Sequence, residues 1–173
     1  MADSTTSAER LPARGPAPRP DVRFMRQRLS RLVALGFGSG LSPWAPGTVG
    51  TLWAWLSFVV LSQWLGPLGW GLLIAAGFAG GIVACSRTAR DLGVADHGAI
   101  VWDEIVAFWL VLLVAPGGWG AQLGAFVLFR FFDIVKPPPI RYYDRTLKSG
   151  FGVMLDDLLA AFYTLLVLAW WHA

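Results

Sequence analysis

Five long apolar stretches constrain what this chain can fold into more than any other feature of its sequence. They cover residues 50–65, 68–86, 100–115, 119–135 and 152–171. Each is about 16 to 20 residues long, which suits a transmembrane helix at the short end of the usual range. Short Gly/Pro-rich segments follow the first and third stretches and predict tight turns between antiparallel helices. The pattern therefore predicts an all-α fold, a polytopic membrane helix bundle with about five transmembrane helices.

The composition supports this fold class. Hydrophobic residues make up 55% of the 173 residues and ten residues are Trp, which is too apolar for an ordinary soluble domain of this size. The single cysteine, Cys85, cannot form an intrachain disulfide, and no Cys/His zinc motif is present. Oxygen atoms are therefore the metal ligands that the sequence offers.

The N-terminal part of the chain differs in composition. Residues 1–29 are rich in Pro, Arg, Ala and Ser and lack an apolar core of signal-peptide length. We predict a disordered basic tail there, and one membrane-embedded domain over residues 30–173. Acidic residues in the tail make an organelle transit peptide a poor fit. Residues 32–41 are apolar but short and glycine-rich, which predicts a re-entrant or interfacial loop before the first span.

All fourteen Lys and Arg residues fall on one side of this predicted bundle. They lie before the first span, between the second and third, and around the connection from the fourth to the fifth. The two short turns on the other side carry none. Because basic loops stay in the cytoplasm, we predict a cytoplasmic N-terminus and a C-terminus on the opposite side.

Five carboxylates gather at the basic side. Asp103 and Glu104 begin the third span, Asp133 ends the fourth, and Asp156 and Asp157 begin the fifth. Since the spans alternate in direction, these acids reach one level near one membrane face. They repel one another unless a cation lies among them, and an all-oxygen set suits Mg²⁺. Adjacent helical residues point about 100° apart, so each neighbouring pair is expected to give one direct ligand and one supporting group or ligand of a second metal.

A simpler interpretation is that these acids cap helix N-termini, where the helix dipole favours a negative charge. That interpretation suits a single acid at a helix start. It explains neither Asp133, which lies at a helix C-terminus, nor the doubled acids on two helices.

The segment GFGSGLSPWAPGTVGTL, residues 36–52, leads into the first span. Pro46 fixes a turn, Gly47 and Gly50 let backbone approach a ligand, and Thr48 or Thr51 can cap the following helix. Exposed N–H groups at a helix start bind anions such as phosphate. Taken alone this is a weak signal, because a glycine-rich turn could simply be structural, but it gains weight because the segment faces the carboxylates on the same membrane side.

Two further residues carry open alternatives. Lys136 follows the fourth span, where it could neutralise a phosphate or contact anionic headgroups. His97 precedes the third span and could be a base, an orienting residue or an ordinary interfacial histidine.

Four segments together resemble the signature blocks of the phosphatidylglycerophosphatase A family, in order. They are GFGSGLSPWAPGTVGTL, DHGAIVWDEIV, FRFFDIVKPPPIRYYD and GFGVMLDDLLA. The resemblance covers about residues 35–161 and departs from the family pattern chiefly at Ala107 and Ala161, where Gly is usual. It implies a bacterial, Mg²⁺-dependent inner-membrane phosphatase that converts phosphatidylglycerophosphate to phosphatidylglycerol, with a phospholipid and no nucleic acid as its partner.

The residues and the resemblance together give a set of expected roles. The metal ligands or general base would be Asp103, Glu104, Asp133, Asp156 and Asp157, with His97 as a further catalytic candidate. The substrate-binding residues would be Ser42, Pro46, Gly47, Thr48, Gly50, Arg130 and Lys136. The alternative function is a cation- or proton-coupled membrane carrier, whose acids should lie near the bilayer midplane on discontinuous helices.

Overall fold

The computed structural model describes residues 19–94, 97–115, 117–147 and 149–172. Within these residues every regular element is helical, which confirms the predicted all-α class. The elements are α1 (Val22–Arg26), α2 (Leu29–Ala34), the 3₁₀ helix η1 (Gly36–Leu41), α3 (Pro46–Leu61), α4 (Pro67–Leu92), α5 (Trp102–Val114), α6 (Trp119–Val135), α7 (Ile140–Thr146) and α8 (Gly150–His172). Each of the five apolar stretches forms one of the helices α3, α4, α5, α6 and α8.

The helix ends follow the turn residues. Pro46 and Pro67 stand in the first turns of α3 and α4, where the missing N–H of proline costs nothing. Gly93 closes α4 with a φ of 73°, the left-handed geometry that glycine adopts most easily. The predicted capping of α3 by Thr48 or Thr51 is wrong, because no side chain caps this helix and the Thr51 hydroxyl instead donates to the Gly47 carbonyl.

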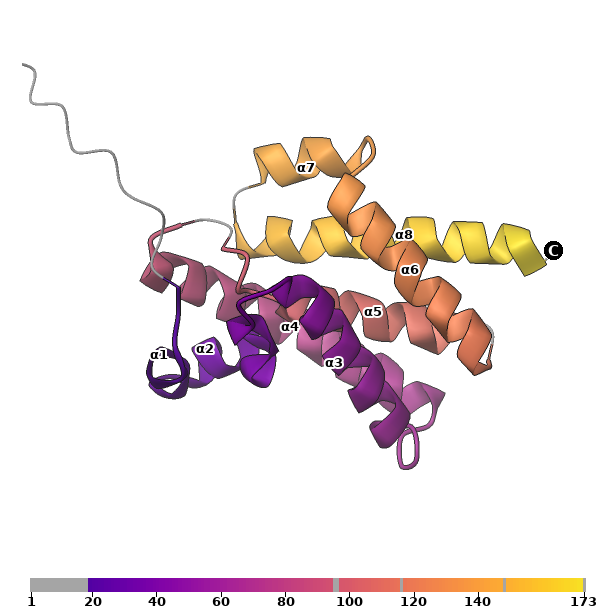
Figure 1. Ribbon diagram of the computed structural model, residues 1–173, viewed down its shortest axis with the longest axis horizontal. Helices are drawn as coiled ribbons and strands as arrows, with labels where there is room; N and C mark the ends of the chain where they lie inside the picture. The colour runs from indigo at the N-terminus through magenta and orange to yellow at the C-terminus, as the bar shows by residue number, and fades with distance from the viewer. Residues whose placement is uncertain (1–18, 95–96, 116, 148, 173) are drawn as a thin grey trace, which may run out of the picture.

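Helix α5 is the centre of the bundle. It packs against α3, α4, α6 and α8, and nine of its thirteen residues are buried. Figure 1 shows α3 and α6 crossing it obliquely, with α4 and α8 running along the molecule beside it. At 13 residues α5 is about 20 Å long, shorter than the ~30 Å hydrocarbon core of a bilayer. Its neighbours cover most of its surface, and only Val114, at the C-terminal end of α5, is exposed.

Tight contacts and indole hydrogen bonds fix α5 in place. Ala107 on α5 and Ala161 on α8 are both fully buried in the core, so their methyl groups are accommodated at helix contacts. The indole N–H of Trp102 donates to the Gly77 carbonyl on α4 at 2.9 Å, and that of Trp109 donates to the Ala54 carbonyl on α3 at 3.1 Å. Both indoles are therefore buried without leaving a polar group unpaired.

Two of the helices, α4 and α8, are long and apolar enough to cross a membrane, and α3 is a shorter apolar helix. Large apolar side chains are also exposed on the outer faces of the bundle. They include Trp53, Leu56, Trp64, Leu68, Leu72, Trp119, Leu123, Val127, Phe162, Leu166, Trp170 and Trp171. Many large exposed apolar side chains are typical of proteins that contact lipid or a partner.

The short apolar segment before α3 forms helices, where the sequence predicted a loop. Residues 32–41 contribute to α2 and to η1, which a positive φ at Phe37 and Gly38 interrupts. Gly36 packs directly on α5, since a Cβ atom there would lie 2.7 Å from Cδ1 of Ile105. This segment therefore packs against the N-terminal half of α5.

Arg31 joins α2 to the end of α4. Its side chain is largely buried, donates to the Asp91 carboxylate at 2.9 Å and to the Gln27 side chain, and lies over the Phe24 ring. Phe24 belongs to α1, which falls inside the range predicted as a disordered tail. Residues 1–18 of that tail lie outside the described residues.

Asp91→Ala is expected to lower the free energy of unfolding by about 1 to 3 kcal/mol, because it removes the charged acceptor of the largely buried Arg31. Thermal unfolding of the purified protein in detergent measures this. Arg28→Ala is the matched control. Arg28 reaches the same carboxylate at 3.6 Å, but its side chain is 62% exposed, so a loss below about 0.5 kcal/mol is expected. Equal losses of unfolding free energy in the two variants would show that the contact between Arg31 and Asp91 adds no particular stability.

Candidate metal centre

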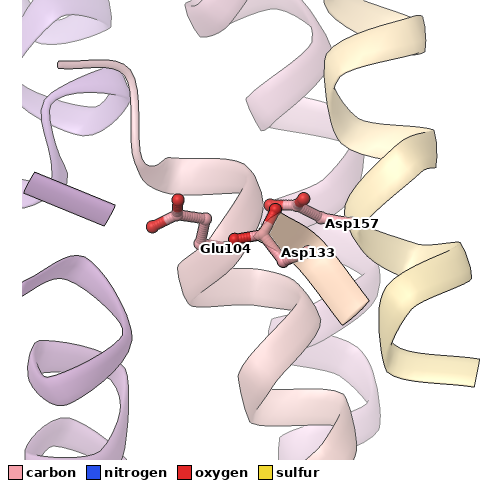
Figure 2. Close-up of side chains that lie close together, drawn as sticks. All are labelled: Glu104, Asp133 and Asp157. Atoms are coloured by element: carbon pink, nitrogen blue, oxygen red, sulfur yellow. The ribbon is translucent and has the colours of Figure 1, made fainter. Parts of the chain in front are cut away.

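Three helices bring Glu104, Asp133 and Asp157 together. Figure 2 shows the carboxylates of Asp133 on α6 and Asp157 on α8 close together, with Glu104 of α5 beside them and its carboxylate turned to the left. Each offers one oxygen atom, and these atoms all lie within 4.8 Å of one another. Glu104 lies in the first turn of α5 and Asp133 near the C-terminal end of α6, so the antiparallel arrangement of these helices places both at one level. The convergence expected from the alternating spans is therefore present, while the chemical roles stay predictions.

Two members of the trio are buried, Glu104 is partly buried, and the hydrogen bonding of the trio is incomplete. Asp133 is 8% exposed and Asp157 is 3% exposed. Oε2 of Glu104 and Oδ2 of Asp157 are buried and have no hydrogen-bond partner among the described residues. An unpaired buried carboxylate is strongly unfavourable, and a bound cation removes that cost. An all-carboxylate donor set with free lone pairs therefore fits a hard divalent cation.

The other two acids support the trio. Asp103 is buried, and its Oδ1 accepts the Glu104 backbone N–H at 3.0 Å, which helps to set the start of α5. Asp156 is buried, and its Oδ2 accepts a hydrogen bond from Lys136 Nζ at 2.5 Å. Glu104 and Asp157 belong to the trio and Asp103 and Asp156 do not, while the expected division of each pair into a direct ligand and a supporting group stays a prediction.

Two cationic side chains contact the carboxylates. Arg130 Nη1 lies 3.0 Å from Glu104 Oε1 and 2.6 Å from Asp133 Oδ2, and it is 3.4 Å from the buried Thr51 hydroxyl. Lys136, in a left-handed conformation at the end of α6, pairs with Asp156. Five carboxylates thus lie near two cationic groups, an imbalance that favours a further positive charge. The sequence pointed to Arg130 as a phosphate ligand and missed both its carboxylate contacts and the contact with Thr51.

The glycines at the start of α3 permit a close approach to α5. A Cβ atom at Gly47 would lie 2.8 Å from Cδ of Glu104, and one at Gly50 would lie 2.8 Å from Cβ of Val101. The sequence predicted that these glycines let backbone approach a ligand. The structure shows that they let α3 approach the first turn of α5, so Gly47 directly limits where the Glu104 carboxylate can lie.

Three of the other candidates lie around a separate pocket of about 210 Å³. Ser42, Pro46 and His97 line it together with Arg19. The Ser42 hydroxyl donates to the Trp44 carbonyl at 2.7 Å, and Nδ1 of His97 accepts the Ala99 N–H at 3.1 Å. The cluster of possible metal ligands found in the described part of the chain does not include His97. Thr48 is half-buried in the first turn of α3.

The sequence was compared with protein-family models and with known proteins. A family model described as phosphatidylglycerophosphatase A matches residues 32–172. A Haemophilus influenzae protein named phosphatidylglycerophosphatase A is 50% identical over 137 residues, 79% of this chain and 84% of the relative. An Escherichia coli protein of the same name is 43% identical over 144 residues, 81% of this chain and 83% of the relative.

A third relative, from Bacteroides thetaiotaomicron, is 40% identical over 147 residues, 80% of this chain and 90% of the relative, and carries a provisional name as a phosphatidylinositol-3-phosphatase. No solved structure matches the chain. The family match spans α3 to α8 and every member of the carboxylate cluster, which confirms the resemblance seen in the four sequence segments. The chain belongs to the phosphatidylglycerophosphatase A family.

Proposed function

We propose that this protein is a Mg²⁺-dependent phosphatase that hydrolyses phosphatidylglycerophosphate to phosphatidylglycerol in phospholipid biosynthesis. The names of the two relatives at 50% and 43% identity supply the activity and the substrate. The observation that carries the chemistry is the trio of Glu104, Asp133 and Asp157, with its buried, unpaired oxygens on Glu104 and Asp157. The residues present thus fit the metal that the family implies.

Glu104, Asp133 and Asp157 would hold the ion, which supplies Lewis-acid polarisation of a phosphate oxygen. The surrounding residues would position these ligands and balance charge. Asp103 fixes the first turn of α5 and hence Glu104, and Lys136 holds Asp156 beside Asp157. In hydrolysis water attacks phosphorus, the bond from phosphorus to the glycerol oxygen breaks, and that oxygen takes up a proton. Arg130 is the nearest cationic group to the trio that could neutralise phosphate charge.

We further propose that helices α3 to α6 and α8 form a multi-pass domain of the bacterial inner membrane, with the carboxylates facing the cytoplasm. Exposed Trp64, Trp119, Trp170 and Trp171 lie at helix ends that point away from the carboxylates, as an interfacial aromatic belt would. The basic residues lie toward the opposite end. Reporter fusions at the C-terminus should report a periplasmic location, and a cytoplasmic one would remove a span from this topology.

The substrate is tested with purified protein, Mg²⁺ and a panel of phosphatidylglycerophosphate, phosphatidic acid and phosphatidylinositol 3-phosphate. We expect inorganic phosphate to be released fastest from phosphatidylglycerophosphate. Faster release from the inositol lipid would instead follow the name of the Bacteroides relative. No observation favours the carrier alternative, because Glu104 and Asp133 lie in terminal turns of their helices. Counter-flow in proteoliposomes without phosphate release would revive it.

Gly47→Ala is expected to lower phosphatase activity about tenfold to a hundredfold with little loss of thermal stability. The added methyl group displaces the flexible end of Glu104 rather than backbone, so the carboxylate moves while the fold persists. Gly124→Ala in α6 is the matched control, since a Cβ atom there meets nothing within 4 Å. Unchanged activity in Gly47→Ala would show that the exact position of Glu104 is unimportant.

A further inference from the structure

Arg130 contacts two of the carboxylates that a metal ion would also bind. Its Nη1 atom bridges Glu104 and Asp133, two of the three members of the trio, at 3.0 Å and 2.6 Å. A cation bound by the same carboxylates would place a second positive charge next to the guanidinium. Because like charges repel strongly in a water-poor site, an ion bound by these two side chains would weaken their hold on the guanidinium.

The same side chain has an unused donor. Arg130 Nε is buried and has no hydrogen-bond partner among the described residues. A guanidinium has five N–H groups in a planar fork, and two parallel bonds to one phosphate or carboxylate are its strongest arrangement. The contacts with Glu104 and Asp133 both use Nη1, so Arg130 does not form two parallel hydrogen bonds with either carboxylate.

We propose that Arg130 is an exchangeable counter-ion: it neutralises Glu104 and Asp133 while the metal is absent, and the metal displaces it onto the phosphate of the substrate. The inference rests on the proposed metal site. It goes beyond that site because it gives Arg130 two alternative sets of partners, the carboxylates and the substrate phosphate. In the metal-free arrangement the Thr51 hydroxyl, which is buried on α3, lies beside the guanidinium at 3.4 Å from Nη1.

An exchange of this kind couples two binding events. A metal that releases Arg130 makes the guanidinium available to an anion, and an anion that holds Arg130 leaves the carboxylates free for the metal. Linkage then requires each ligand to raise the affinity for the other by the same factor. A residue that only braced the fold would produce no such coupling.

The experiment measures Mn²⁺ affinity of the full-length protein in detergent by electron paramagnetic resonance, with and without methylphosphonate as a stable phosphate analogue. In the wild type we expect methylphosphonate to tighten Mn²⁺ binding about fivefold or more. In Arg130→Gln we expect tighter Mn²⁺ binding without the analogue, and no further effect of the analogue. Arg130→Lys keeps the charge and should fold with reduced coupling, which covers the case in which the Gln variant is unstable.

Arg141→Gln is the matched control. Arg141 is exposed, its described hydrogen bond is to the Val135 carbonyl, and its loss removes the same charge from the same end of the protein. It should leave Mn²⁺ affinity and coupling unchanged. Weaker or unaltered Mn²⁺ binding in Arg130→Gln, or coupling that survives there, overturns the exchange.

These outcomes separate the two proposals. A wild-type protein that binds no Mn²⁺ removes the metal site and the exchange together. A wild-type protein that binds Mn²⁺ but releases no phosphate from phosphatidylglycerophosphate contradicts the proposed substrate, while the Arg130 result still decides the exchange.

Discussion

Asp157→Asn is expected to lower the rate of phosphate release about 10²- to 10³-fold, because it removes a full negative charge from the group of oxygens that would face the metal. Asp156→Asn should cost only about tenfold, since Asp156 pairs with Lys136 and is not a member of the trio. Steady-state assays of the two variants at saturating Mg²⁺ measure the difference. If both variants keep near-normal activity, the pair serves only the start of α8 and the catalytic site lies elsewhere.

Stability should change in the opposite order. Asp157→Asn removes a buried charge that repels its neighbours, so without metal the variant should be at least as stable as the wild type. Asp156→Asn breaks the ion pair with Lys136 and should lower the melting temperature. Mg²⁺ should stabilise Asp157→Asn less than the wild type, because only binding to the native state raises stability. Thermal unfolding with and without Mg²⁺ gives all three comparisons.

Removal of the metal with EDTA is expected to abolish phosphate release altogether, and added Mg²⁺ or Mn²⁺ should restore it. The trio has buried, unpaired oxygens that a cation would satisfy, and a bound cation would polarise the phosphate. At a Mg²⁺ concentration 100 times its dissociation constant, binding should also stabilise the protein by about 2.7 kcal/mol. Activity that persists in EDTA would contradict the metal mechanism.

The convergence of the acids could be predicted from the sequence because it depends only on helix order and direction. Glycine- and proline-rich turns make consecutive helices antiparallel, so acids at the start of one and the end of the next share a level. The start of α5 and the end of α6 illustrate this with Glu104 and Asp133. No tertiary contact had to be known for that inference.

Which member of each acidic pair would face the metal could not be predicted. That choice depends on the rotation of α5 and α8 about their axes, which packing determines. On α5, fully buried Ile105 and Phe108 fix the rotation, and Glu104 then reaches the trio while Asp103 turns back to the backbone. The glycines before α3 were limited in the same way. Their spacing predicted a close approach of the backbone, but it could not show that Gly47 approaches Glu104.

The burial of most of α5 has a consequence for how the chain can change in evolution. One inserted or deleted residue rotates everything beyond it by about 100°. At the start of α5 such a change would turn Glu104 away from Asp133 and Asp157 and would disturb contacts with four neighbouring helices at once. Related sequences are therefore expected to keep the length of residues 101–114 constant, and to vary in length at the exposed turn between α3 and α4.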